Sequence, residues 1–322
     1  MQQKRICRGI EKIHLGYYPT PLTRLENISR ETGINFYIKR DDLCGLVFGG
    51  NKVRKLEYLL AHAKAHGFDT ILTAGGAQSN HAVLTAACCR KLGLDVLLLL
   101  KKRGVTETRG NLLLAQLMNI PVRFIDTDRY ADVYAEAETI MEAMRAEGKH
   151  PWLIPVGGSI PLGALGYLDA AEEIAAQAEE AGFSIHHIVC CSGSGGTHAG
   201  LILGTKKLGA RVTGIVVSVE EDFQAEIYNL ALETAKLAGI ETDLVLDDVV
   251  LKAYIGPGYA QPSEEGAAAI RFMAEKEGIF LDPVYTGKTF AGFLDLFSKG
   301  YFAPGENVVF VHTGGGPALF AL

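Results

Sequence analysis

Short apolar runs alternate with helical patterns along this chain, and that alternation constrains its fold more than any other feature. The runs predict strands at Phe36–Ile38, Ile71–Thr73, Val96–Leu100, Val122–Ile125, Ile188–Cys191, Ile215–Val219 and Val308–Val311. The stretches between them carry helix formers and apolar residues at three- and four-residue spacing. They predict helices over Arg54–His66, Ala82–Leu92, Gly110–Met118, Ala131–Glu147, Leu165–Ala181, Ala199–Leu208 and Glu264–Glu277. The pattern indicates an α/β fold of open, twisted, mostly parallel sheets with helices on both faces.

Three glycine-rich turns each precede a predicted helix. Residues 49–55 read Gly-Gly-Asn-Lys-Val-Arg-Lys, residues 75–81 read Gly-Gly-Ala-Gln-Ser-Asn-His, and residues 192–197 read Ser-Gly-Ser-Gly-Gly-Thr. Glycine lets the backbone approach a ligand closely, and a helix start offers unpaired N–H groups to anions. Ser79 or Asn80 is predicted to cap the second helix. Lys52, in the first turn, is a candidate to bind an aldehyde cofactor whose phosphate lies nearby.

The composition excludes several classes of function. The 322 residues carry a net charge of −6, with Lys and Arg spread along the whole length, so no nucleic-acid partner is predicted. The longest apolar stretches, such as Val96–Leu100, are far shorter than the roughly 20 residues of a membrane-spanning helix. No apolar signal segment follows Met1, so we expect a cytoplasmic protein. The pairs Cys88–Cys89 and Cys190–Cys191 match no metal or disulfide spacing and are expected to be buried thiols.

The chain shows no linker, internal repeat or low-complexity segment, so any division into domains must be discontinuous. The Gly- and Pro-rich stretch Pro155–Gly163 is the best candidate for a crossing between lobes. We predict a large domain made of residues 1–48 and 160–322, with a smaller α/β domain of residues 49–159 inserted into it. This arrangement would set the three glycine turns around one cleft.

Two groups of polar residues have structural explanations. Asp41 and Asp42 lie between a strand and a loop, and we expect them to pair with Arg40, Lys39 or backbone N–H groups. The pair His186–His187 precedes a strand and lacks acidic partners at ligand spacing. No metal site is therefore predicted.

Six ordered motifs together resemble one family. Besides the three glycine turns they are Tyr18–Leu22 (YPTPL), Ile38–Asp42 (IKRDD) and His312–Gly315 (HTGG). The chain resembles the pyridoxal-phosphate enzymes of the tryptophan synthase β fold type, and within them the branch that holds D-cysteine desulfhydrase and 1-aminocyclopropane-1-carboxylate deaminase. The likeness extends from Tyr18 to Phe320. It implies a two-lobed fold, pyridoxal 5′-phosphate as cofactor, a small amino acid as substrate and a homodimer.

The resemblance also assigns roles to individual residues, beginning with a covalent bond between Lys52 and the cofactor aldehyde. The cofactor-binding residues that it implies are Lys52, Asn51, Lys55, Asn80, Gly193, Ser194, Gly195, Gly196, Thr197, Thr286 and Thr313. The substrate-binding residues that it implies are Ser79, Asn80, His81, Gly158, Tyr259 and Tyr285. Lys52, Ser79, Tyr259 and Tyr285 are the catalytic candidates. The segment from Gly193 to Thr197 would hold the phosphate.

The residue after Tyr285 distinguishes two activities within this branch. In the deaminase a glutamate follows that tyrosine, whereas this chain has Thr286. A neutral partner, by resemblance Thr313, would leave the pyridine nitrogen unprotonated and the cofactor a weaker electron sink. Departure of a β leaving group is then favoured over opening of a cyclopropane ring. His81 matches the desulfhydrase side, but Ala82–Leu84 lack a basic residue expected in most relatives, which leaves the substrate open.

We therefore expect β-elimination from a small amino acid, D-cysteine first, giving pyruvate, ammonia and hydrogen sulfide, with Lys52 as the base at Cα. Lyases acting on L-cysteate, D-serine or diaminopropionate, and 1-aminocyclopropane-1-carboxylate deaminase, stay open as alternatives. So does an inactive homologue that binds the cofactor or an amino acid. A Rossmann dehydrogenase is disfavoured, because Gly193–Gly196 is too compact for its G-x-G-x-x-G motif.

Overall fold

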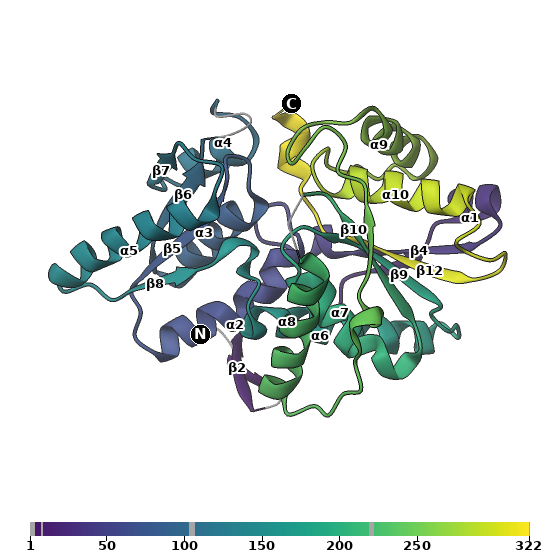
Figure 1. Cartoon of the computed structure of the whole chain (residues 1–322), viewed down its shortest axis with the longest axis horizontal. Coiled ribbons are helices and arrows are strands. Elements are labelled where there is room, and N and C mark those ends of the chain that lie inside the picture. Colours follow the sequence, from purple (N-terminus) through teal and green to yellow (C-terminus); the bar gives the residue numbers. More distant parts are fainter. Residues whose placement is uncertain (1–3, 8, 103–106, 219–221, 322) are drawn as a thin grey trace.

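The computed structural model describes residues 4–7, 9–102, 107–218 and 222–321. Within them the chain forms two large sheets, each with helices on both faces, and a short hairpin (Figure 1). We call the four-stranded sheet with its helices the small lobe and the six-stranded sheet with its helices the large lobe. Apart from the hairpin, the one antiparallel pair described joins β3 to β4 in the large lobe. The predicted α/β class with mostly parallel sheets is confirmed.

The small lobe has the strand order β7-β6-β5-β8, with every neighbouring pair parallel. Its strands are β5 Thr70–Gly76, β6 Asp95–Lys101, β7 Val122–Ile125 and β8 Pro151–Ile154. Its helices are α3 Asn80–Leu92, α4 Gly110–Leu117 and α5 Tyr130–Ala146. Successive strand residues face opposite sides, so Leu98 packs in the core with α3 while Leu99 packs against α5.

The large lobe has the strand order β11-β10-β9-β12-β4-β3. Its strands are β3 Leu22–Arg24, β4 Asn35–Arg40, β9 His187–Ser192, β10 Arg211–Val216, β11 Val250–Ala253 and β12 Asn307–His312. Its helices are α1 Glu26–Thr32, α6 Pro161–Glu180, α7 Gly196–Thr205, α8 Phe223–Ala238, α9 Glu264–Glu277 and α10 Thr286–Ser298. Ile188 faces the core with α6, α7 and α8, and Val189 faces the core with α1, α9 and α10.

Helix α2, Asn51–Ala65, runs between the lobes and belongs to both cores (Figure 1). Its Leu59 packs in the core of the small lobe, while the adjacent Tyr58 packs with α6. The hairpin of β1 Lys4–Cys7 and β2 Ile10–Ile13 lies beside this helix. The domain boundaries at residues 49 and 159 stay a prediction. No helix in the described part of the chain is long and apolar enough to cross a membrane.

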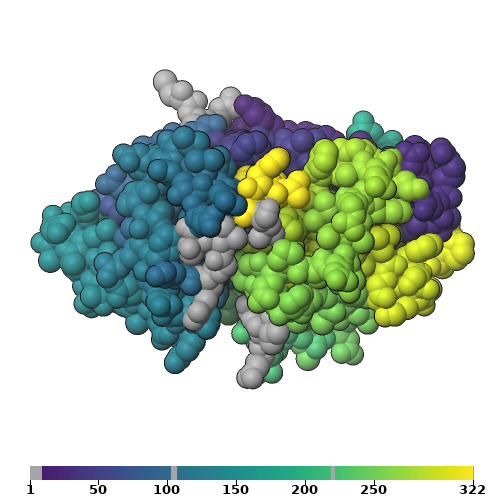
Figure 2. All heavy atoms as spheres, turned by 90° about the horizontal axis from the view of Figure 1, so that it is seen from above, coloured from purple at the N-terminus to yellow at the C-terminus, as the bar shows by residue number. Residues whose placement is uncertain are grey.

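Short 3-10 segments complete the fold at Asp41–Leu43 (η1), Val156–Gly158 (η2), Lys206–Leu208 (η3), Leu246–Asp248 (η4) and Gly316–Phe320 (η5). The last of these touches α4, and Figure 2 shows this C-terminal segment between the two lobes on the upper face. The four paired cysteines named above are buried free thiols, as predicted.

Element bounds differ from the sequence predictions at several positions, and two of these differences bear on the site. Helix α2 begins at Asn51 rather than Arg54, because Gly50 at φ 128° precedes it directly. Strand β10 ends at Val216, where both neighbouring strands also end, whereas the prediction ran to Val219, which lies outside the described residues. Helices α1, α8 and α10 were not predicted; for α10, Thr-Gly-Lys-Thr is a poor helix start by propensity alone.

Candidate active site

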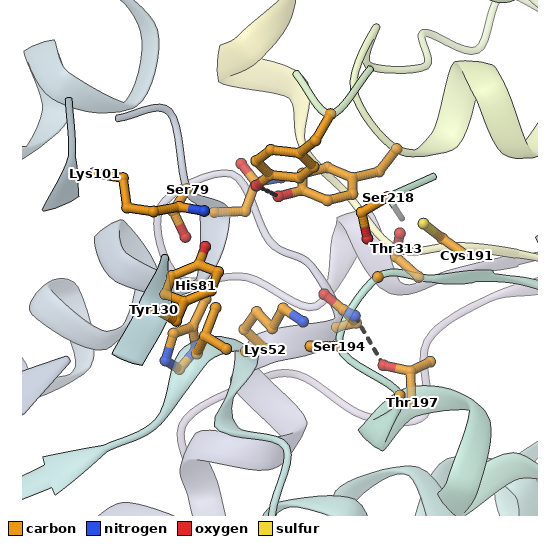
Figure 3. Close-up of a pocket in the computed structure, with 18 of the residues that line it drawn as sticks. Lys52, Ser79, His81, Lys101, Tyr130, Cys191, Ser194, Thr197, Ser218 and Thr313 are labelled. Carbon is orange, nitrogen blue, oxygen red and sulfur yellow. Dashed lines mark hydrogen bonds between the residues drawn. The ribbon is translucent and has the colours of Figure 1, made fainter. Parts of the chain in front are cut away.

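A cavity of about 740 Å³ opens between the lobes where α2, α3 and α7 begin. The carboxyl ends of β5, β9 and β12 lead to it, which is the usual place for ligands on parallel sheets. In Figure 3 Lys52 lies centrally, with Ser79 and His81 on one side and Thr197 and Thr313 on the other.

The predicted site residues largely meet at this cavity. Those that line it are Asn51, Lys52, Ser79, Asn80, His81, Gly193, Ser194, Gly195, Thr197, Tyr259, Tyr285 and Thr313. Four others do not line it: Lys55, Gly158, Gly196 and Thr286.

Lys52 lies in the first turn of α2 with its side chain half-buried. The glycines before it are required by close packing, since a Cβ on Gly49 would lie 2.0 Å from the Asp42 carbonyl oxygen. Among the described residues its ammonium has no hydrogen-bond or salt-bridge partner. Burial lowers the pKa of Lys52 to about 8. The neutral fraction of this amine near neutral pH is therefore far larger than that of an ordinary lysine.

The turn before α7 forms a cup of backbone N–H groups. Gly195 takes φ 77°, and Gly193, Ser194, Gly195 and Thr197 face the cavity. The cup is tied to the lysine turn, because Asn51 Nδ2 donates to Thr197 Oγ1 at 2.9 Å. A helix start with this geometry suits a phosphate dianion.

Lys55 lies directly behind the cup. A Cβ on Gly196 would lie 2.7 Å from Lys55 Nζ, so glycine is needed there. Lys55 Nζ donates to the Gly157 carbonyl at 3.1 Å and to Ser159 Oγ at 3.2 Å. Ser159 in turn accepts from Gly196 N–H at 3.2 Å and donates to Ser194 Oγ at 2.9 Å. Lys55 therefore supports the cup through Ser159 without lining the cavity, and burial lowers the pKa of its ammonium well below its usual range.

Ser79 caps α3, as predicted, with its Oγ accepting from Ala82 N–H at 3.2 Å. Asn80 follows it, and its Oδ1 accepts from Asn111 Nδ2 of α4 at 2.7 Å. That bond orients the Asn80 amide, so its nitrogen is left to donate toward a ligand. A Cβ on Gly315 would lie 2.9 Å from this nitrogen, which places it between the lobes.

His81 is buried at the wall of the cavity. Its Nε2 lies 2.8 Å from Thr73 Oγ1, and that hydroxyl donates to the Ile154 carbonyl at 2.8 Å. The single hydroxyl proton is thus used, so His81 Nε2 must donate and Nδ1 carries the lone pair. Burial and the charges of Lys52 and Lys55 lower the pKa of His81 well below its usual range. His81 is a neutral side chain here.

Tyr259 and Tyr285 both line the cavity, with their hydroxyl oxygens 2.5 Å apart. Tyr285 directly precedes α10, and Tyr259 comes from the loop between β11 and α9. Burial, and then the neighbouring Tyr259, raise the pKa of Tyr285 well above its usual range. Tyr285 therefore stays a neutral phenol that can donate or relay a proton.

A family model described as pyridoxal-phosphate dependent enzyme matches residues 13–314. The chain belongs to this family. Its cofactor is accordingly pyridoxal phosphate. The cavity fits this group, since it offers at Lys52 an amine that no described residue pairs with and, across from it, an anion cup at the start of α7.

Relatives within this pyridoxal-phosphate family have two different names. The chain is 42% identical over 309 residues to a D-cysteine desulfhydrase of Klebsiella pneumoniae, an alignment that covers 94% of this chain and 93% of the relative. It is 39% identical over 322 residues to a 1-aminocyclopropane-1-carboxylate deaminase of Methylobacterium nodulans, with 96% of each covered. A crystal structure of an ACC deaminase homologue superposes with a TM-score of 0.90 at 43% identity, over 97% of this chain and 94% of the other.

Thr286 is not brought to the cavity of this pyridoxal-phosphate enzyme. It is fully buried, and its hydroxyl donates to Asp282 Oδ2 at 2.7 Å and accepts from Asp282 N–H at 2.8 Å. The Asp282 carboxylate also accepts the N–H groups of Val284, Tyr285 and Thr286 at 2.7 to 2.9 Å. Asp282 thus fixes the start of α10. Of the two threonines predicted to bind the cofactor, Thr286 and Thr313, only Thr313 lines the cavity.

Gly158 does not line the cavity either, because it packs against the side chains of His81 and Leu59. A Cβ at this position would lie 3.4 Å from His81 Cε1 and 2.9 Å from a methyl carbon of Leu59. With φ 58°, the residue serves the packing of the imidazole ring.

Several cavity residues were missed by sequence reasoning. Lys101, at the end of β6, donates to the Asp128 carbonyl at 3.1 Å and lies 3.9 Å from the centre of the Tyr130 ring. Cys191 and Ser218 line the cavity from the large lobe. Position at or directly after the end of a predicted strand was a usable signal for Cys191 and Lys101. Nothing in the local sequence pointed to Tyr130.

Proposed function

We propose that this pyridoxal-phosphate enzyme catalyses β-elimination from a small amino acid, with D-cysteine as the favoured substrate. D-cysteine and one water would yield pyruvate, ammonia and hydrogen sulfide. The observation that carries the proposal is the Lys52 amine, whose pKa burial lowers to about 8, in a cavity whose wall holds the phenol pair of Tyr259 and Tyr285. A base and a proton donor are thereby available in one cavity.

In this reaction, different residues of the chain would bind the cofactor, bind the substrate and transfer protons. When bound, pyridoxal phosphate supplies an electron sink for charge that develops at Cα. Lys52 would hold the cofactor and then accept the Cα proton, for which an amine of pKa about 8 is suited. The N–H groups at the start of α3 and Ser79 would hold the substrate carboxylate. The phenol of Tyr259 or Tyr285 would donate to the departing sulfur.

The surroundings of Thr286 support elimination over opening of a cyclopropane ring. Its hydroxyl is committed to Asp282, and the Asp282 carboxylate is committed to the start of α10. Neither therefore supplies an acid to the cofactor. The neutral Thr313 hydroxyl would face the pyridine nitrogen, and an unprotonated ring favours rapid loss of a β substituent.

A second candidate is deamination of 1-aminocyclopropane-1-carboxylate. The observation that favours it is the 39% identity to the deaminase of Methylobacterium nodulans over 96% of this chain. This substrate would give a four-carbon oxo acid and ammonia without sulfide.

The test is an assay of the cofactor-loaded protein with D-cysteine, L-cysteine, L-cysteate, D-serine, diaminopropionate and 1-aminocyclopropane-1-carboxylate. Sulfide, sulfite, ammonia and the two oxo acids are measured separately. Sulfide and pyruvate from D-cysteine in equal amounts would support the proposal. Release of the four-carbon oxo acid alone would favour the second candidate. No product from any substrate, despite bound cofactor, would support an inactive binding homologue.

We also propose that the protein is a cytoplasmic homodimer with residues 49–159 as an inserted domain. These proposals rest on the resemblance described above. Sedimentation equilibrium measures the assembly, and a monomer at micromolar concentration would contradict the dimer.

A further inference from the structure

The loop that carries Tyr259 has little hydrogen bonding of its own. Residues 254–262 join β11 to α9 without regular structure, and Gly256 and Gly258 take φ 65° and 155°. Within this loop, among the described residues, the one backbone hydrogen bond runs from Gln261 N–H to the Gly258 carbonyl at 3.3 Å. Such a segment needs support from elsewhere to present a phenol at a fixed position.

A buried lysine supplies this support. Lys288 of α10 is 1% exposed, and its Nζ donates to the Ile255 carbonyl at 2.7 Å and to the Gly258 carbonyl at 2.8 Å. The two bonds hold the loop on either side of its Gly-Pro segment. Its aliphatic stem passes Gly266 near the start of α9, where a Cβ would lie 3.5 Å from Lys288 Cγ.

Burying the charged ammonium of Lys288 lowers the stability of the fold. Among the described residues it forms no salt bridge, and burial lowers its pKa. A buried ammonium that lacks a carboxylate is costly, and an apolar chain of the same length would avoid that cost. Its two short hydrogen bonds to the loop are the contacts that account for its position.

The same helix start holds both phenols. Tyr285 is fixed by its N–H bond to Asp282 Oδ1 at 2.7 Å. Lys288 follows three residues later, on the neighbouring helical position, and reaches the loop of Tyr259. The distance of 2.5 Å between the phenol oxygens therefore depends on two anchors on one element.

We propose that Lys288 is a positioning residue, which fixes the loop of residues 254–262 so that the Tyr259 hydroxyl meets Tyr285 at the cavity. Its kinetic consequence rests on the proposed β-elimination, whereas its structural consequence does not. Lys288 acts through Tyr259 and does not touch the substrate.

The structural test is amide hydrogen exchange in the cofactor-loaded protein. In Lys288→Met, exchange of the Gln261 amide should be faster by about tenfold to a hundredfold, because its acceptor, the Gly258 carbonyl, loses the contact to Lys288 that fixes it. The control Lys276→Met removes an exposed lysine in the last turn of α9, paired with Glu31, and should leave exchange unchanged. Unchanged loop exchange in a folded Lys288→Met would overturn the proposal.

A second measurement covers the case in which Lys288→Met does not fold. Tyr259→Phe keeps Lys288 and removes the contact between phenols, so the loop should keep nearly the exchange rate of the parent protein. If Tyr259→Phe alone releases the loop, the phenol contact holds it and the proposal fails.

The kinetic test is a double-mutant cycle with Tyr259→Phe. We expect Lys288→Met to lower kcat by about tenfold to a hundredfold, with a smaller change in KM. In the Tyr259→Phe background the same substitution should have little further effect on kcat, because the phenol it positions is already gone. If the double variant instead lost kcat by the product of the two single-variant losses, Lys288 would act independently of Tyr259 and the proposal would fail. If the parent protein releases no sulfide from D-cysteine, the proposed function fails while the exchange test still decides the role of Lys288.

Discussion

Lys52 and Arg54 lie two residues apart at the start of α2, and their surroundings are opposite in kind. Arg54 donates to both oxygens of Asp41 at 2.8 and 2.9 Å and to both oxygens of Glu173 at 2.9 and 3.0 Å. Its guanidinium also lies 4.3 Å from the centre of the Tyr18 ring. These partners raise the pKa of Arg54, while burial without partners lowers the pKa of Lys52 to about 8.

The difference means that Arg54 holds α2 in place, while Lys52 is left for chemistry at the cavity. The ion cluster of Arg54, Asp41 and Glu173 joins η1, α2 and α6, and Tyr167 and Thr20 donate hydroxyl hydrogen bonds to Asp41 at 2.6 and 2.8 Å. Because the Arg54 face of α2 fixes the first turns of the helix, the Lys52 face can present an amine that no described residue pairs with. Each side of the comparison can be changed alone.

The largest expected effect is on the Lys52 side. Lys52→Met removes the amine and keeps the length of the chain, so turnover should fall by more than about a thousandfold. Unfolding by urea should show unchanged or increased stability, since a half-buried cation without a partner is lost. Lys64→Met, in the last turn of the same helix, is the matched control and should retain activity. Turnover close to that of the parent protein would remove Lys52 from the mechanism.

On the other face, Asp41→Asn should cost about 3–5 kcal/mol of unfolding free energy, because it leaves the buried guanidinium of Arg54 without its main partner. Asp41 is fully buried. The control Glu138→Gln breaks an exposed pair with Arg145 and should cost under about 1 kcal/mol. Equal losses in the two variants would show that the cluster does not hold α2.

Local and long-range features explain which parts of this site the sequence predicted. Ser79 as a helix cap, Lys52 at a helix start and the cup before α7 depend on residues within one turn. Asp42 pairs with Arg40 at 2.7 Å, as predicted, because the partner is two residues away. The partners of Asp41 were missed, since Arg54 and Tyr167 reach it only through the packing of α2 on α6.

Thr286 illustrates the same limit on the cofactor side. Sequence comparison placed it where a related enzyme has a glutamate, but the burial of Asp282 decides what the position can do. A carboxylate introduced at residue 286 would lie against Asp282, whose pKa burial already raises. Thr286→Glu would therefore disturb the start of α10 as well as the cofactor, and it is a poor probe of the pyridine nitrogen.

The role of the guanidinium shape can be tested at Arg54 itself. Arg54→Lys keeps the charge but cannot form paired hydrogen bonds to Asp41 and Glu173 at once, so stability should fall by about 2 kcal/mol. Urea unfolding measures the loss, and activity at temperatures where the variant is folded should be retained. A variant as stable as the parent would mean that charge alone holds the cluster.

The smallest expected effect is the pH dependence of the Lys52 amine. With a pKa of about 8, roughly a tenth of this amine is neutral at about pH 7 and roughly nine tenths at about pH 9. Labelling of cofactor-free protein by an amine reagent, followed by peptide mass analysis, should therefore speed up about tenfold at Lys52 over this range and level off above it. A lysine of ordinary pKa, about 10.4, keeps accelerating to higher pH. If Lys52 did so too, the contrast with Arg54 would be one of hydrogen bonding alone, and burial would not prepare the amine for catalysis.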